Sequence, residues 1–263
     1  MSDEQPNRMT ADDRNALKNA VKSLEYTSLG MRAASAVGTP IERAIDSLPE
    51  KGRELVQEAT RRSLDACLKL ALSSFRADKT NRPFDGWHRA TCVLSGAIGG
   101  FFGMSGLIVE LPVSTAIMLR SIAAIAQSEG EDLDDTDTRL SCLSVFAFGA
   151  RSKGDDNADA GYFGVRAALA RALPRAAERT VPPALARFLA VIADRFGVAV
   201  SEKVVAEAVP VVGAVGGGAI NLVFIRHFQD VAHGHFTVRR LERKYGQDVV
   251  RQEYERERSS LKG

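Results

Sequence analysis

Two long stretches of the chain contain no charged residue and are rich in glycine. Residues 90–109 include five glycines among 20 residues, and residues 208–225 include four glycines among 18. A charge-free run of about 18 residues or more is long enough to cross a bilayer as a helix. The glycines lower the hydrophobicity of both runs, and the whole chain has a mean hydropathy of −0.11. These features favour helices buried in a soluble protein, with transient or constitutive entry into a membrane as the alternatives.

The glycines in these runs predict close helix packing. Glycine costs about 1 kcal/mol per helix position relative to alanine, so several of them need a compensating role. Gly96 and Gly100 are four residues apart, as are Gly99 and Gly103, and small residues at this spacing let helix backbones approach closely. The pentapeptide 96–100 also resembles 213–217. We therefore expect a core of pseudo-repeated helical hairpins.

Apolar residues elsewhere recur every three or four positions, which indicates helices, and two-residue alternation is nearly absent. We predict an all-α fold, a multi-helix bundle with the two glycine-rich apolar helical segments at its core. Residues 1–10 are expected to form a disordered tail, and residues 11–258 a single helical domain, with Thr10 capping the first helix. Besides the two glycine-rich runs, helices are expected over 11–37, 40–48, 54–75, 112–127, 139–148, 162–179 (interrupted at Pro174), 184–205, 221–242 and 247–258.

Composition narrows the classes of function. The chain has 263 residues and a net charge of +2, and this near-balance argues against a nucleic-acid partner. Cys67, Cys92 and Cys142 have no CxxC spacing and lie among apolar residues, so we expect buried reduced thiols and a cytoplasmic location. The polar start of the chain has no secretory signal pattern.

The most informative single residue is Glu110, which follows the first charge-free run and precedes Leu111-Pro112. A carboxylate buried there without a partner would be costly. It is therefore either a helix cap or half of a buried salt bridge, with Arg120 or Arg226 as the candidate partner, or it binds a ligand or titrates a proton. Asn221, the polar residue of the second run, is the matching ligand-binding candidate.

The histidines form the most suggestive cluster. His227, Asp230 and His233 are three and six residues apart on an expected helix, so the first two share a face and the third does not. A regular helix cannot chelate a metal with all three, and a metal site would need Glu110 or another distant ligand. Ordinary helix residues are the simpler interpretation, and His227 and Asp230 remain ligand-binding candidates. Phosphate-loop, dinucleotide-binding and nucleophile-elbow motifs are absent, so we expect no cofactor and no catalytic residue.

A series of arginines follows the expected helix at 162–179. Basic residues on an amphipathic helix can lie on an anionic membrane surface, and a solvated helix face is the alternative. The candidate membrane-facing residues are Arg166, Arg171, Arg175 and Arg179.

The chain resembles the EcsC family over roughly residues 55–255. The resemblance rests on the first glycine-rich run with Glu110-Leu111-Pro112, on 119–122 through Gly130-Glu131-Asp132, and on Val209-Pro210 through Asn221, His227, Asp230 and 240–246. The family commonly has Asp at position 110 and aromatic residues beside Gly130, where this chain departs from it. The family is similar to a protein encoded beside an ABC transporter, and its members are mostly of unknown function, so the resemblance implies no catalytic residue.

We therefore expect a non-enzymatic cytoplasmic protein, peripheral at the inner face of the membrane. It would associate with the membrane surface or bind an apolar ligand such as a lipid, and would regulate a membrane transport or secretion system, with a membrane transporter protein as partner. The alternative is a metal-dependent hydrolase that uses Glu110, His227, Asp230 and His233.

Overall fold

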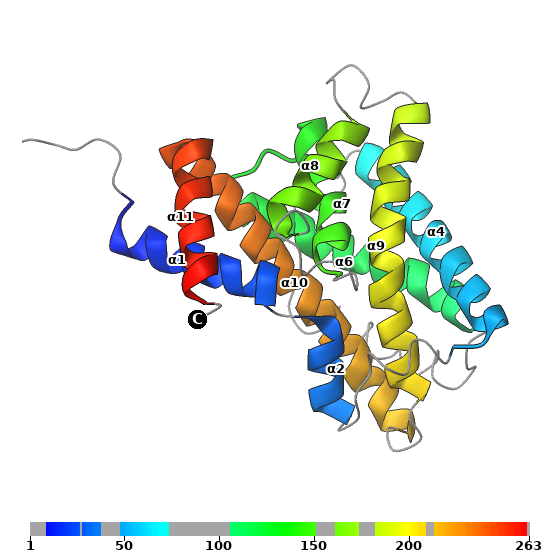
Figure 1. The fold of residues 1–263 in the computed structure, drawn as a ribbon. Coiled ribbons are helices and arrows are strands. Elements are labelled where there is room, and N and C mark those ends of the chain that lie inside the picture. The colour runs from blue at the N-terminus through cyan, green and yellow to red at the C-terminus, as the bar shows by residue number, and fades with distance from the viewer. Residues whose placement is uncertain are drawn as a thin grey trace, which may run out of the picture.

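The computed structural model describes residues 9–26, 28–37, 48–73, 106–150, 161–173, 182–208 and 213–261. Within these ranges every regular element is a helix, so the predicted all-α class is confirmed (Figure 1). The expected helix at 40–47, most of the first glycine-rich run, Cys92, Arg175 and Arg179 lie outside the described residues. The elements are α1 (Ala11–Val21), a π-helix (Lys22–Tyr26), α2 (Leu29–Val37), α4 (Glu50–Leu72), α6 (Leu107–Ser128), α7 (Thr136–Phe148), α8 (Tyr162–Ala172), α9 (Pro182–Ala208), α10 (Gly213–Tyr245) and α11 (Gln247–Ser260).

The helix ends follow from local side chains. The Thr10 hydroxyl accepts a hydrogen bond from the Asp13 amide at 3.2 Å and begins α1, as predicted. Asp135 begins α7 in the same way, through a bond from the Asp137 amide. Gly130 and Gly246 have φ values of 83° and 88°, a left-handed conformation that glycine adopts without strain. These two glycines therefore allow the sharp turns after α6 and α10.

The single helix predicted over 11–37 is wrong, because α1 ends at Val21 and the separate helix α2 does not begin until Leu29. The backbone widens into the π-helix, and a new helix then begins where the Ser28 hydroxyl accepts a hydrogen bond from the Met31 amide at 3.1 Å. The π-helix lies against α10 at Gly234, where an added Cβ would be 3.0 Å from Leu24 Cγ. The segment 11–37 has no glycine or proline before residue 30 that would predict a break. Close packing on α10 and the Ser28 cap thus divide it into two helices.

The second glycine-rich run is helical from Gly213 onward. We predicted the last long helix from about Asn221, but α10 begins eight residues earlier and continues without interruption to Tyr245. The helix therefore carries Gly216, Gly217 and Gly218 in its first two turns.

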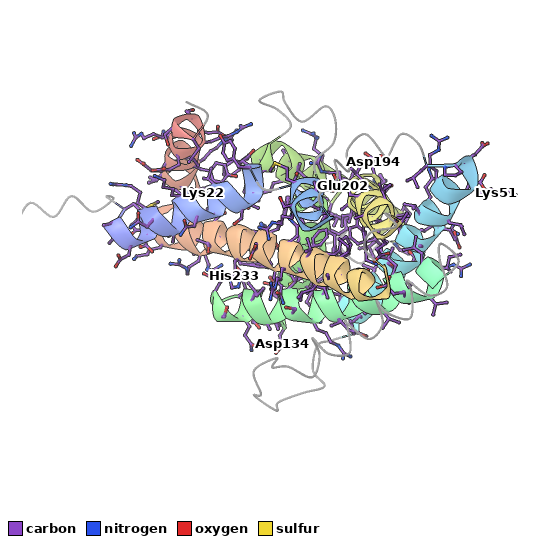
Figure 2. The ribbon with its side chains drawn as sticks, turned by 90° about the horizontal axis from the view of Figure 1, so that it is seen from below. Lys22, Lys51, Asp134, Asp194, Glu202 and His233 are labelled. Atoms are coloured by element: carbon purple, nitrogen blue, oxygen red, sulfur yellow. The ribbon has the colours of Figure 1, made fainter. Side chains whose placement is uncertain are left out.

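Helices α6 and α10 lie side by side and run in the same direction (Figure 2). Three hydrogen bonds join residues that are 108 apart in the sequence: Gln229 to Ser121, Thr237 to Glu129, and Arg239 to Glu131. A constant separation of this kind requires a parallel pair. The first turns of α6 and α10 therefore lie at the same end of the molecule, and both glycine-rich runs lead into this end.

The apolar core lies between α6, α7, α9 and α10. Phe146, Phe196, Phe224 and Phe228 are fully buried, and neighbouring ring centroids are 4.9–5.5 Å apart for four of their pairs. Cys67 and Cys142 are buried free thiols, and burial raises the pKa of each to about 12. Both cysteines therefore behave as the small apolar residues that we expected.

Candidate functional site

A buried cluster of two glutamates and one lysine lies at the end where α6 and α10 begin. The ammonium of Lys203, near the end of α9, donates to Glu110 Oε2 at 2.9 Å and lies 3.1 Å from Glu207 Oε1, one turn further along α9. The ring of Phe224 on α10 is 5.8 Å from the same nitrogen. Three helices thus meet at one charged side chain, and we call Glu110, Lys203 and Glu207 the Glu–Lys–Glu cluster.

The cluster is largely removed from water. The side chains of Lys203 and Glu110 are 1% and 7% exposed, whereas that of Glu207 is 20% exposed. One oxygen, Glu110 Oε1, is buried and has no hydrogen-bond partner among the described residues. Buried acceptors are nearly always satisfied in native proteins, so such an oxygen marks a position that can take a further donor.

The charges in the cluster act on each other strongly. Burial works against the ammonium form of Lys203, but the charges of Glu207 and Glu110 outweigh it and raise its pKa above the usual range. Burial raises the pKa of Glu207 above its usual range, and the nearby charge of Glu110 adds to this rise while Lys203 opposes it. The lysine therefore stays charged, which excludes it as a nucleophile at neutral pH.

Glu110 forms the kind of buried salt bridge that we expected, but with a different partner. Arg120 and Arg226, the two candidates, are both exposed, and the partner is Lys203, 93 residues away. The sequence signal was the pair Glu202-Lys203, which stands inside an otherwise apolar stretch of α9. An amphipathic pattern alone did not reveal that this pair is buried.

The structure does not bring the histidine and aspartate candidates together with Glu110. His227 is buried, and its Nε2 donates to the carbonyl of Gly149 at the end of α7; burial lowers its pKa to about 4. Asp230 pairs with Arg32 of α2 at 2.7 Å, and His233 is exposed (Figure 2). Among the described residues there is no group of three or more His, Cys, Asp or Glu side chains that could hold a metal ion.

Asn221 is fully buried on α10, one turn before Phe224. The arginine candidates divide between two surroundings: Arg166 makes a bidentate ion pair with Glu242, with both contacts at 2.7 Å, whereas Arg171 is exposed. Five residues apart on α8, these two arginines lie on different faces. The charge of Arg166 is thus already paired within the fold, and the ligand-binding and membrane-facing roles stay predictions.

Sequence reasoning missed a second buried polar group, centred on His235. Its Nε2 lies 2.7 Å from the Ser141 hydroxyl and its Nδ1 lies 2.8 Å from the Tyr162 hydroxyl. Burial lowers the pKa of His235 well below its usual value, and burial raises that of Tyr162 to about 12. The ring therefore stays neutral with both nitrogens bonded, which is a structural arrangement linking α7, α8 and α10.

One face of α6 near the Glu–Lys–Glu cluster leaves apolar side chains in solvent. Val109 is 72% exposed and Val113, one turn later, is 48% exposed. In the part of the chain that is described, α6 is the single helix long and apolar enough to cross a membrane, a length and composition that the buried core helices of soluble proteins share. Of the most apolar 18-residue stretch of α6, 56% is buried, because the helix packs against α4 and α10.

Fold and site together define a class: an all-helical protein with parallel α6 and α10 and a buried ionic cluster where both helices begin. A comparison with family models identifies the family within that class. The EcsC protein family model matches residues 11–241, and the chain belongs to this family. No curated protein and no solved structure matched the chain.

Proposed function

We propose that this protein is a peripheral membrane-binding protein of the cytoplasm that contacts the bilayer through the N-terminal half of α6. The observation that carries the proposal is the exposure of Val109 and Val113 on neighbouring turns of the same helix face. Single exposed apolar residues are common on soluble proteins, but an adjacent pair at the end of a charge-free run is the arrangement of an interfacial helix.

The rest of this face has the polarity that a membrane surface requires. Val109, Val113, Arg120 and Gln127 lie within about 40° of one another around the helix, since 18 residues complete five turns. The last two are exposed. Arg120 lies roughly 10 Å beyond Val113 along the axis at 1.5 Å per residue. Apolar side chains at one end of the face can therefore enter the acyl region while the guanidinium reaches the level of the headgroups.

The test is flotation of the purified protein with phosphatidylglycerol-containing vesicles. Replacing both valines by glutamine (V109Q/V113Q) removes the apolar contact without adding charge, and glutamine is a better helix former than valine. Partial burial of two valines stabilises the bound state by about 1.5 kcal/mol or more, so the double variant should partition about tenfold more weakly.

A matched control uses the other two exposed large hydrophobic residues among those described, Met31 at 48% and Leu72 at 38%. The double variant M31Q/L72Q removes a similar apolar area from α2 and α4 and should bind vesicles like the wild type. If the wild type fails to float with vesicles, or if both double variants lose binding equally, the assignment of this face of α6 is wrong.

A further inference from the structure

The Glu–Lys–Glu cluster has an imbalance of charge. Two carboxylates surround one ammonium, so the fully ionised cluster carries a net charge of −1, and Lys203 is the only cation within ion-pair distance of Glu110 or Glu207 among the described residues. A net charge held in a site of low polarity is costly unless it is compensated. Within the described part of the chain, the cluster must therefore gain one positive charge or tolerate the cost.

The surroundings limit where that charge can come from. Glu110 comes from α6, Lys203 and Glu207 from α9, and α10 contributes the ring of Phe224. Glu202, also buried on α9, adds no positive charge. The two carboxylates are acceptors already oriented toward one donor, and the partly exposed side chain of Glu207 gives the cluster contact with solvent.

We propose that the Glu–Lys–Glu cluster is a proton-binding site in which Glu207 is protonated under conditions where ordinary glutamates are ionised. The proton comes from water and converts one carboxylate to a neutral carboxylic acid, so the cluster becomes one ion pair, Glu110 with Lys203, beside a neutral acid. Burial raises the pKa of Glu207 above its usual range although Lys203 opposes the rise, and the neighbouring carboxylate of Glu110 adds to it, which agrees with this charge balance. The inference does not depend on membrane binding.

The proton has a defined effect on stability. Because the folded-state pKa of Glu207 lies above its unfolded value, the folded protein binds the proton more tightly than the unfolded chain. This contribution is fully present below the unfolded pKa and is lost as the pH rises through the folded pKa. Over that window the folding equilibrium constant should fall by up to about tenfold per pH unit.

The direct experiment is infrared spectroscopy of the full chain at a series of pH values above the ordinary glutamate pKa of about 4.3. The carbonyl band of a protonated carboxylic acid is separate from the bands of carboxylates. We expect the wild type to show this band and E207Q to lack it. The variant E110Q should lack it too, because removal of the Glu110 charge leaves Glu207 and Lys203 balanced without a proton. E257Q, on the distant helix α11, is the matched control and should keep the band.

Unfolding by urea from acidic to alkaline pH gives the second readout. The stability difference between E207Q and the wild type should shift in favour of E207Q as the pH rises, while E257Q and the wild type should have parallel curves. Absence of the acid band from the wild type would overturn the proposal. So would a band that persists in both E207Q and E110Q, or a stability difference between E207Q and the wild type that is the same at every pH. Since glutamine has the shape of glutamate, both variants can be checked for native helicity first.

Discussion

Gly149 lies where the end of α7 meets α10, and the ring of Phe228 fills the space that a side chain would need. The same turn is held by His227, which donates to the Gly149 carbonyl, and by Arg195, which donates to the carbonyls of Ala147 and Ala150 at 2.9 Å and 2.7 Å. Carbonyls at the end of a helix lack hydrogen-bond partners within it. His227 and Arg195 therefore donate hydrogen bonds to one carbonyl of the last turn of α7 and to two carbonyls just after it. Glycine at 149 is therefore required by packing.

We predict that Gly149→Ala lowers the free energy of unfolding by about 1–3 kcal/mol, because the added methyl overlaps a ring that other aromatic side chains confine. Gly197→Ala is the matched change in the interior of α9, where nothing lies within 4 Å of an added Cβ. There the substitution should stabilise the protein by up to about 1 kcal/mol, because alanine favours helix. Urea unfolding of both variants measures the two changes in the free energy of unfolding. If the two substitutions change it equally, the Phe228 ring can move aside.

At the scale of elements, α1 is fixed to the last turns of α10 by one carboxylate. Asp13 accepts hydrogen bonds from Lys244 Nζ at 2.7 Å and the Tyr245 hydroxyl at 2.8 Å, and it pairs with Arg240 at 3.2 Å. These bonds, first that from Lys244 and next that from Tyr245, lower the pKa of Asp13 far below its usual range. The start of the chain is thus joined to a helix more than 200 residues later.

We expect Asp13→Asn to destabilise the protein by about 1 kcal/mol at neutral pH, a figure reduced for the partial solvation of its partners. Because the folded-state pKa is depressed, the contribution is present above the unfolded pKa and is lost as the pH falls through the folded pKa. The difference from the wild type should therefore shrink below about pH 4. Thermal unfolding at several pH values measures it, with Asp12→Asn as the control, because Asp12 is exposed in the same turn. If the stability of the wild type and that of D13N depend on pH in the same way, the stabilising role assigned to the ionised Asp13 is wrong.

Helices and their caps could be predicted from the sequence, whereas contacts between distant helices could not. Thr10 and the apolar spacing of α9 are local signals, and the structure agrees with them. Ser28 gave no such signal, because a serine becomes a helix cap only when packing on α10 breaks the preceding helix. The same holds for the candidate site: Glu110 was recognisable as a costly buried acid, but its pairing with Lys203 depends on how α6 and α9 cross.

At the scale of the whole molecule, the two ends of the parallel α6 and α10 differ in how they are held. At the C-terminal end, four basic residues of α10 engage acids from α1 and from the turn after α6, including Glu129 and the buried Glu131. Arg239 and Arg243 both bind Glu131, and hydrogen bonds from Arg239 help to hold its pKa below the usual range in spite of burial. At the N-terminal end, the described residues provide the Glu–Lys–Glu cluster and helix turns that are rich in glycine.

This difference predicts a gradient of local stability along α10. Glycine weakens a helix, and the start of α10 is held by buried side chains such as Phe224 without the several ion pairs of the other end. The segment 218–226 should therefore open more readily than the segment 232–242. The segment 232–242 should exchange its amide hydrogens only on global unfolding, because its side chains join α1, the turn after α6, and α8. Native-state hydrogen exchange followed by mass spectrometry should therefore give exchange at least about tenfold faster in the first segment. Uniform protection along α10 would mean that the glycine-rich end is held as firmly as the other. If the gradient is found, the end of the molecule that carries Val109 and Val113 is also the end that can rearrange on a membrane at the lowest cost in free energy.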